Sequence, residues 1–155
     1  INGAGGVDAL SGGLGTDVIT GGAGKDRLGG LDAFDVPIVN DAAADRFVFN
    51  AVSESGGTAA TRDVIVDFFH ASDKIDLRLI DASTKIAGNQ AFTWQVANGA
   101  AFTGVAGQLH FVKIDAAGTA NDKTIISGDI NGDKVADFQI ELLGLKSLTA
   151  VDFLL

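Results

Sequence analysis

A nine-residue unit repeats through residues 3–29 and limits the folds that this segment can adopt. The unit has the form Gly-Gly-x-Gly-x-Asp followed by x-apolar-x. The copies GGLGTDVIT (12–20) and GGAGKDRLG (21–29) match it at every defined position, and GAGGVDALS (3–11) has alanine in place of the second glycine. Glycines permit the positive φ angles of tight turns, and a single apolar residue between two others suits a minimal strand. The unit therefore predicts six-residue turns alternating with three-residue strands. A flexible glycine-rich linker would not keep the aspartate and the apolar position in phase.

Strands this short can bury an apolar side chain only if the chain coils. Two successive units make one circuit of a flattened roll, in which apolar residues from opposite strands meet, and several circuits must stack to bury a core. We therefore expect a parallel β-roll with turns 3–8, 21–26 and 40–45 on one edge. Turns 12–17 and 30–35 are expected on the other edge.

Stacked turns place aspartates above one another, and their charges repel. The acidic residues are almost all aspartate, since Glu54 and Glu141 are the only glutamates. Calcium resolves such repulsion because it accepts six to eight oxygens from carboxylates and backbone carbonyls. We expect several calcium ions between the layers, held by turn residues of both kinds. The predicted ligands in the repeats are Asp8, Gly12, Gly13, Leu14, Gly15, Asp17, Gly21, Gly22, Ala23, Gly24, Asp26, Gly30, Asp32, Asp35 and Asp45.

The repeat breaks after residue 29. The next apolar position holds Pro37, which has no backbone N–H for a strand ladder. The segment GLDAFDVPI (30–38) keeps its aspartate at Asp35, and NDAAADRFV (40–48) restores the frame with Asp45. We interpret this as a degenerate last repeat that leads into a different architecture.

The rest of the chain has short apolar or alternating segments separated by turn residues, which is typical of β-structure. We therefore expect an all-β chain, in which a parallel β-roll (1–46) continues into a β-sandwich-like region (47–155), with a short helical turn near 147–150. The predicted strands are Arg46–Asn50, Asp63–Phe69, Phe92–Val96, Gln108–Ile114, Thr124–Asp129, Asp137–Leu142 and Asp152–Leu155.

Two further carboxylate groups are candidate metal ligands. Asp63 and Asp73, with Glu54, are expected to close one more calcium site where the roll meets the sandwich. The segment DINGDKVAD (129–137) spaces its oxygen side chains like the start of an EF-hand loop, but position 140 is isoleucine where that loop needs a glutamate. A metal site and a solvated turn both remain open for this segment. Its oxygen-bearing residues are Asp129, Asn131, Asp133 and Asp137.

The nonapeptides resemble the calcium-binding RTX repeat, and the later segments resemble the C-terminal domain of serralysin-type secreted metalloproteases. The resemblance implies a β-roll that runs into a β-sandwich and an uncleaved secretion signal at the C-terminus. The final residues 151–155, one acid followed by apolar residues, fit such a signal. The stretches that carry the resemblance are DRFVFNAVSES (45–55), RDVIVDFFHASDKIDL (62–77), AFTGVAGQLHF (101–111), GDINGDKVADFQIEL (128–142) and SLTAVDFLL (147–155).

This resemblance implies the noncatalytic C-terminal module of a secreted bacterial exoprotein, exported by type I secretion machinery and folded by extracellular calcium. Ile1 occupies an apolar repeat position, so we expect further repeats and a catalytic domain upstream, which a serralysin-like metalloprotease would supply. The alternative is a polysaccharide- or surface-binding RTX module of an alginate epimerase, another extracellular enzyme or an adhesin. We expect a monomer.

Composition excludes several other functions. A net charge of −9 argues against nucleic acid and anionic membranes as partners. Cysteine is absent, and no apolar run is long enough to span a membrane. His70 and His110 are the only histidines, and neither lies in a His-Glu-x-x-His zinc motif. We therefore expect no catalytic site in this chain.

Overall fold

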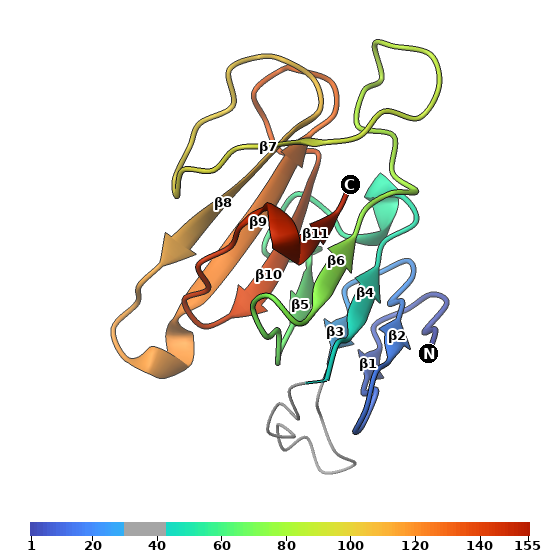
Figure 1. The fold of residues 1–155 in the computed structure, drawn as a ribbon, viewed down its shortest axis with the longest axis vertical. Coiled ribbons are helices and arrows are strands. Elements are labelled where there is room, and N and C mark those ends of the chain that lie inside the picture. The colour runs from blue at the N-terminus through green and yellow to red at the C-terminus, as the bar shows by residue number, and fades with distance from the viewer. Residues whose placement is uncertain (30–42) are drawn as a thin grey trace.

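The computed structural model describes residues 1–29 and 43–155, which form two β-sheets (Figure 1). One sheet has seven strands in the order β1-β3-β5-β10-β9-β8-β7, and the other has four in the order β11-β6-β4-β2. None of the helices in the described part of the chain has the length and apolar character needed to cross a bilayer. The strands are β1 (Ala9–Leu10), β2 (Val18–Ile19), β3 (Arg27–Leu28), β4 (Arg46–Val48), β5 (Asp63–Ile65), β6 (Lys74–Asp76), β7 (Thr93–Trp94), β8 (Gln108–Ile114), β9 (Lys123–Asp129), β10 (Phe138–Leu143) and β11 (Phe153–Leu154), and the 3₁₀ turns are η1 (Val52–Glu54), η2 (Thr119–Asn121) and η3 (Ala150–Asp152).

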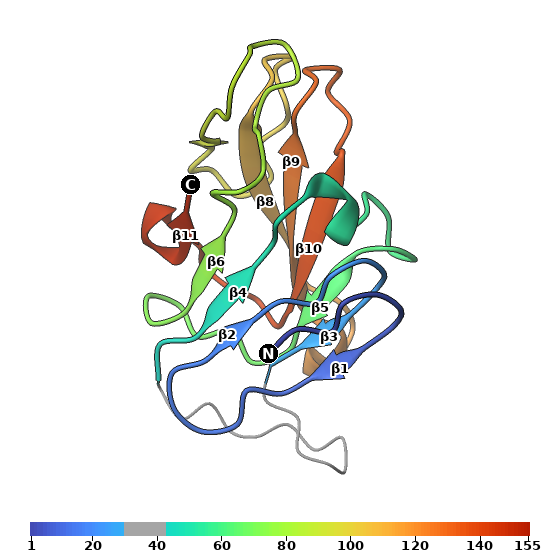
Figure 2. The same ribbon diagram turned by 90° about the vertical axis from the view of Figure 1, so that its right-hand side faces the viewer.

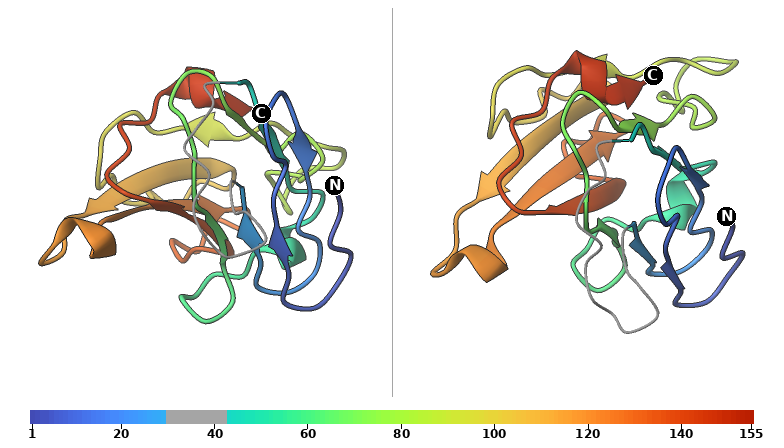
Figure 3. Two further views of the ribbon diagram at one scale, coloured as in Figure 1. Left: turned by 90° about the horizontal axis from the view of Figure 1, so that it is seen from below. Right: turned by 60° about the horizontal axis from the view of Figure 1, so that its bottom comes forward.

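The N-terminal strands coil as the repeat predicts. Strands β1, β3 and β5 pair in parallel in the large sheet, and β2, β4 and β6 pair in parallel in the small sheet (Figure 2). Successive strands therefore alternate between the sheets, and the view from below shows the circuits of the roll stacked on one another (Figure 3). The predicted all-β fold with a parallel β-roll is confirmed.

The roll continues into the C-terminal strands without a break in either sheet. Strand β10 pairs with β5 in parallel and with β9 in antiparallel fashion, and β8 and β7 extend that sheet. Strand β11 adds to β6 in parallel. Both sheets thus contain strands from either side of residue 46, and the division of the chain at that point stays a prediction.

Each of the predicted strand segments of the C-terminal region contains a strand, but β6 was not predicted. It has one inward apolar residue, Ile75, between Lys74 and Asp76, so it shows no alternation over a longer run. Its signal is the sequence Asp73-Lys74-Ile75, which repeats the Asp-x-apolar end of the nonapeptide. The predicted helical turn near 147–150 lies slightly later, at η3.

Asp45 lies on a different edge from the one predicted. Strand β4 pairs with β2, and the Asp17 amide donates to the Asp45 carboxylate, so Asp45 stacks on turn 12–17. The prediction that turn 40–45 shares an edge with turns 3–8 and 21–26 is therefore wrong. Counting in nines puts Asp26 and Asp45 on the same edge, whereas the strands that follow them, β3 and β4, lie in opposite sheets.

The apolar positions of the repeat form the start of the core. Ile19 and Leu28 are buried, Leu10 at the outer circuit is half-buried, and Ile1 is 54% exposed. The same positions continue through later strands, because the β-sheet registers align them in two rows that face each other. One row is Leu10, Leu28, Ile65 and Leu142, and the other is Ile19, Phe47, Ile75 and Phe153.

Glycines allow the turns to stack in contact. Gly5 pairs with Ala23 in an isolated parallel bridge, which sets turn 3–8 directly against turn 21–26. Gly24 has φ +133°, and a Cβ there would overlap the carbonyl oxygen of Gly6 in the neighbouring turn. Gly6 has a similar φ of +128° but no atom within 4 Å of its own Cβ position.

This pair allows turn stacking to be separated from backbone strain. Both Gly24→Ala and Gly6→Ala place a side chain at positive φ, which costs about 1–3 kcal/mol, but only Gly24→Ala also forces the stacked turns apart. We expect Gly24→Ala to lower the thermal midpoint clearly further than Gly6→Ala, measured by circular dichroism in the same buffer. Equal midpoints for the two variants would contradict the stacking.

Candidate metal-binding site

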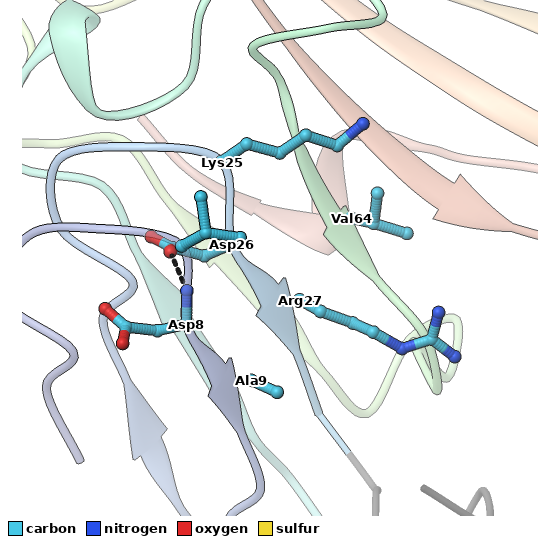
Figure 4. A pocket seen from close by; sticks show the side chains of 7 residues that line it. Asp8, Ala9, Lys25, Asp26, Arg27 and Val64 are labelled. Carbon is cyan, nitrogen blue, oxygen red and sulfur yellow. Dashed lines mark hydrogen bonds between the residues drawn. The ribbon is translucent and has the colours of Figure 1, made fainter.

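Aspartates at the start of alternate strands form a ladder along the first edge of the roll. The Asp8 amide donates to Oδ1 of Asp26 at 2.9 Å (Figure 4), and the Asp26 amide donates to Oδ1 of Asp63 at 2.8 Å. The ladder ends at Ser55, whose Oγ accepts the Asp63 amide at 2.8 Å. Each layer is therefore tied to the next by a carboxylate that accepts a backbone N–H.

A second ladder follows the opposite edge. The Asp17 amide donates to Oδ1 of Asp45 at 2.8 Å, and the Asp45 amide donates to Oδ1 of Asp73 at 3.0 Å. Here the ladder ends in a closed turn, because Oδ2 of Asp73 accepts the Phe69 amide at 2.8 Å and the Phe69 carbonyl accepts the Asp73 amide at 3.0 Å. The predicted ligands therefore gather in two rows.

The second oxygen of most ladder carboxylates is buried without a hydrogen-bond partner among the described residues. This holds for Oδ2 of Asp8, Asp17, Asp26 and Asp63. A buried acceptor left unsatisfied costs about 1–3 kcal/mol, and more when it is charged. These oxygens are therefore placed to accept a hydrogen bond or to bind a cation.

The first glycine of each turn packs against this oxygen. A Cβ at Gly3 would lie 2.7 Å from Oδ2 of Asp8, and one at Gly12 would lie 2.6 Å from Oδ2 of Asp17. A side chain at either position would therefore fill the space beside the carboxylate. The glycine–aspartate pairing within each unit thus makes a cradle of carboxylate and backbone oxygens, and this donor set fits a hard cation such as calcium.

The electrostatics of the first edge match this arrangement. The pKa of Asp63 is raised to about 7, chiefly by burial and also by the charges of Asp26 and Glu54, against the hydrogen bond from the Asp26 amide and the charge of Lys25. The pKa of Asp26 is also raised, first by burial and then by the charges of Asp8 and Glu54. Negative charge on this edge is therefore undercompensated.

The second edge shows the same effect at its end. The pKa of Asp73 is raised to about 6, chiefly by burial and also by the charges of Asp45 and Asp67, against hydrogen bonds from the Phe69 and Asp45 amides. Asp67 belongs to this edge through its charge, and the repeat did not predict it as a ligand. Ser55, which ends the first ladder, was not predicted either, since it has no repeat position that could have marked it.

The expected joint site of Asp63, Asp73 and Glu54 is wrong. Asp63 begins β5 in the large sheet and Asp73 precedes β6 in the small sheet, so each ends a separate ladder. Glu54 lies near the first edge, where its charge acts on Asp63, and its carboxylate accepts the Asn50 amide at 2.7 Å. Successive strands of a roll alternate between sheets, which separates two aspartates that are close in sequence.

No three carboxylate, histidine or cysteine side chains converge into a metal cluster within residues 1–29 and 43–155. A cation at either edge therefore needs backbone oxygens of the turns as well as two carboxylates from successive layers. Gly30, Asp32 and Asp35, the other predicted ligands, lie outside the described residues. Whether the predicted ligands bind calcium stays a prediction.

The carboxylates of segment 129–137 are engaged by the protein itself. Asp129 accepts the amides of Asn131, Gly132 and Lys134 at 3.1, 2.6 and 3.0 Å. Asp137 accepts the Ile130 amide at 2.7 Å and the Asn131 side-chain amide at 2.9 Å. Of the two interpretations left open, this geometry favours a hydrogen-bonded turn.

The first ladder is accessible from the outer face of the large sheet. Asp8 and Asp26 line a pocket of about 420 Å³ together with Lys25, Arg27 and Val64 (Figure 4). The Lys25 ammonium is held by the Ala59 carbonyl at 2.7 Å, and in the close view Lys25 and Arg27 extend away from the two carboxylates. The pocket therefore borders two aspartates of the first ladder.

Comparisons with known proteins agree with this architecture. Residues 4–155 match a family profile described as peptidase M10 serralysin C terminal. The solution structure of the AlgE6R2 subunit of the Azotobacter vinelandii mannuronan C5-epimerase has a TM-score of 0.60 and 25% identity, over 99% of this chain and 80% of that chain. The AlgE6R3 subunit of the same enzyme has a TM-score of 0.53 and 19% identity, over 96% and 77%. Among curated proteins, none matches the sequence.

The raised pKa values predict how acid affects the cation-free protein. A carboxylate whose folded-state pKa is raised from about 3.9 contributes stability that is present at low pH and lost as pH rises through the folded pKa, here about 6 for Asp73 and about 7 for Asp63. Acid neutralises these carboxylates, so in excess chelator we expect the folded fraction and the thermal midpoint of the protein both to rise between pH 8 and pH 5, the midpoint by roughly 5 °C or more.

Asp63→Asn serves as the control, because asparagine keeps an acceptor for the Asp26 amide but does not titrate. Burial lowers the pKa of His110, which opposes the effect in wild type and variant alike, so the measured quantity is the difference between the two proteins. If that difference does not change between pH 8 and pH 5, the raised pKa of Asp63 is refuted.

Proposed function

The chain belongs to the family of peptidase M10 serralysin C-terminal domains, and we propose that it is the noncatalytic, calcium-binding C-terminal module of a secreted bacterial exoprotein. The resemblance stated from the sequence is thereby confirmed at the level of the family. The proposal has three parts: calcium at the two edges, folding that depends on this calcium, and export through the C-terminal segment.

The observation that carries the calcium assignment is the buried second oxygen of the ladder aspartates. Oδ1 of Asp26 and Oδ1 of Asp63 each accept an amide of the ladder, and the amides of Asp8 and Asp17 donate to the next carboxylate. All four aspartates keep a buried Oδ2 without a partner among the described residues. Calcium at these edges would supply positive charge and coordination to oxygens. The chain's part is to hold pairs of carboxylates one layer apart and to expose turn carbonyls beside them.

Folding of the repeats then depends on the cation. Without it, each added circuit brings another aspartate onto a row that is already negative, and very short strands gain little from their own pairing. Binding to the folded state alone adds to the free energy of unfolding. Extracellular calcium modules bind with a Kd on the order of 10⁻⁴–10⁻³ M, so such a roll stays unfolded where calcium is scarce and folds after export.

The histidines have structural surroundings that fit a noncatalytic module. Nδ1 of His70 lies 2.9 Å from Oδ1 of the buried Asp152. His110 packs edge-to-face on Phe102 with ring centroids 4.3 Å apart. Neither histidine has a nucleophilic side chain as a partner in the described structure, so the proposed role rests on binding and folding.

A calcium titration tests the calcium part of the proposal. We expect calcium to raise the thermal midpoint and the β-sheet signal in circular dichroism, and we expect Asp26→Asn and Asp45→Asn, one on each edge, to raise the required calcium concentration by roughly tenfold or more. Asp133→Asn is the matched control, because its carboxylate accepts only the Val135 amide in the sandwich loop. Equal midpoints in calcium and in excess chelator would refute calcium-dependent folding.

The export part is tested separately. Residues 151–155 form the end of η3 and β11, and their acid-then-apolar sequence fits a secretion signal. We expect removal of these five residues to reduce secretion from a type I-competent host strongly while the protein accumulates inside the cell. A variant of the exposed turn residue Leu14, Leu14→Ala, should be secreted normally. Undiminished secretion of the truncated protein would place the signal elsewhere.

A second candidate function is binding of a polysaccharide or surface. The observation that favours it is the structural likeness to an R-module subunit of a mannuronan C5-epimerase over nearly the whole chain. Retention of the calcium-loaded chain on a polysaccharide resin, lost in chelator, would favour this candidate. Without such retention the folding and export role stands alone.

A further inference from the structure

We propose that the C-terminal strand β11 is a latch, docked onto the roll by the ladder of Asp17, Asp45 and Asp73 through the turn 69–73. This inference rests on the proposed calcium role of that ladder and adds a coupling between it and the C-terminal segment. Figure 2 shows η3 and β11 at the end of the small sheet, beside β6.

The latch is held by few contacts. Strand β11 has two residues, and β6 is its partner in the sheet. The Leu77 amide donates to the Leu154 carbonyl at 2.9 Å. Phe153 is buried against Trp94, with ring centroids 4.5 Å apart. Terminal elements with so few contacts open at a small fraction of the global free energy of unfolding.

The other attachment of the latch is a buried carboxylate. Asp152 is fully buried, and its Oδ2 accepts the Thr149 amide at 2.7 Å, which closes the turn that leads into β11. Its Oδ1 accepts the Ala71 amide at 2.9 Å and lies 2.9 Å from Nδ1 of His70. Asp152 therefore stays satisfied only while residues 70 and 71 keep their positions.

The turn that carries these residues is closed by the last carboxylate of the second ladder. Asp73 accepts the Asp45 amide through Oδ1 and the Phe69 amide through Oδ2. Between them, Ala71 holds φ at +71°, a left-handed conformation that a non-glycine residue adopts only when the surroundings enforce it. A ladder hydrogen bond therefore fixes one side of the turn, and the C-terminal segment is bonded to the other.

The second ladder and the C-terminal segment share one bistable element, the turn 69–73. If Asp73 loses its place in the ladder, the 69–73 turn relaxes, and the buried Oδ1 of Asp152 loses the Ala71 amide and His70 while Oδ2 keeps the Thr149 amide. A buried charge that loses partners strongly favours exposure to water, which for Asp152 means undocking of η3 and β11. Filling the ladder with calcium therefore favours the docked latch, and the C-terminal segment is free only in the calcium-free chain.

The chain contains an intrinsic fluorescence probe for undocking of β11. Trp94 is the only tryptophan, and it contacts Phe153. We expect calcium to change Trp94 emission and to slow hydrogen exchange of the amides of residues 153–155 by about tenfold or more. At a calcium concentration that half-saturates each protein, Asp73→Asn should lose both responses, whereas Asp26→Asn, on the other edge, should keep them.

Variants on the latch side complete the experiment. Asp152→Asn should abolish protection of residues 153–155 while β2 and β4 still become protected by calcium. Should Asp152→Asn fail to fold, His70→Ala supplies the test. Truncation of this half-exposed side chain removes one contact of Asp152 and leaves the core intact.

The outcomes separate the two proposals. If calcium does not change hydrogen exchange in β2, β4 or residues 153–155, the proposed function fails, and the latch fails with it. If β2 and β4 respond but residues 153–155 do not, only the latch is overturned. Equal effects of Asp26→Asn and Asp73→Asn on Trp94 emission would also overturn it, since coupling would then not pass through the 69–73 turn.

Discussion

The hydrogen bond from each aspartate amide to the carboxylate one layer on is the interaction on which the rest of the structure depends. It fixes the vertical register of the turns, so that Asp8, Asp26 and Asp63 stack on one edge and Asp17, Asp45 and Asp73 on the other. The same bond gathers like charges in a buried row, which is unfavourable without a cation. A single contact therefore sets the order of the roll and gathers the charges at which we propose that calcium binds.

The core follows from this register. Because the ladder aligns the turns, the apolar residue two positions after each aspartate falls into one of two facing rows, and these rows run on into the sandwich at Leu142 and Phe153. The C-terminal region ends both ladders with groups that carry no net charge, the Ser55 hydroxyl on one edge and the closed turn at Phe69 on the other. The last aspartate of each ladder therefore hydrogen-bonds to an uncharged group of the C-terminal region.

Much of this could be predicted from the repeat alone. The phase of Asp and apolar residues over 3–29 predicts the turns, the parallel strands and the burial of Ile19 and Leu28. The errors share a cause: the edge on which an aspartate lies depends on how many times the chain has crossed between the sheets, and the regular nine-residue spacing ends at residue 29. Asp45 was assigned by spacing, and Asp63 and Asp73 by their positions beside apolar strand residues; neither signal records the crossings. Ser55 and Asp152 act through contacts distant in sequence, for which no local pattern exists.

Alternation between the sheets also constrains how such a chain can change in length. A ladder bond joins residues 18 positions apart within the regular repeats, as from Asp8 to Asp26. Duplication of two nonapeptides adds a full circuit and leaves every later residue on its own edge, whereas duplication of one transfers all later strands to the opposite sheet. Duplication within arrays of this type should therefore be tolerated in even numbers of units. Whether the array has an odd or even number of units must match the C-terminal region that follows it.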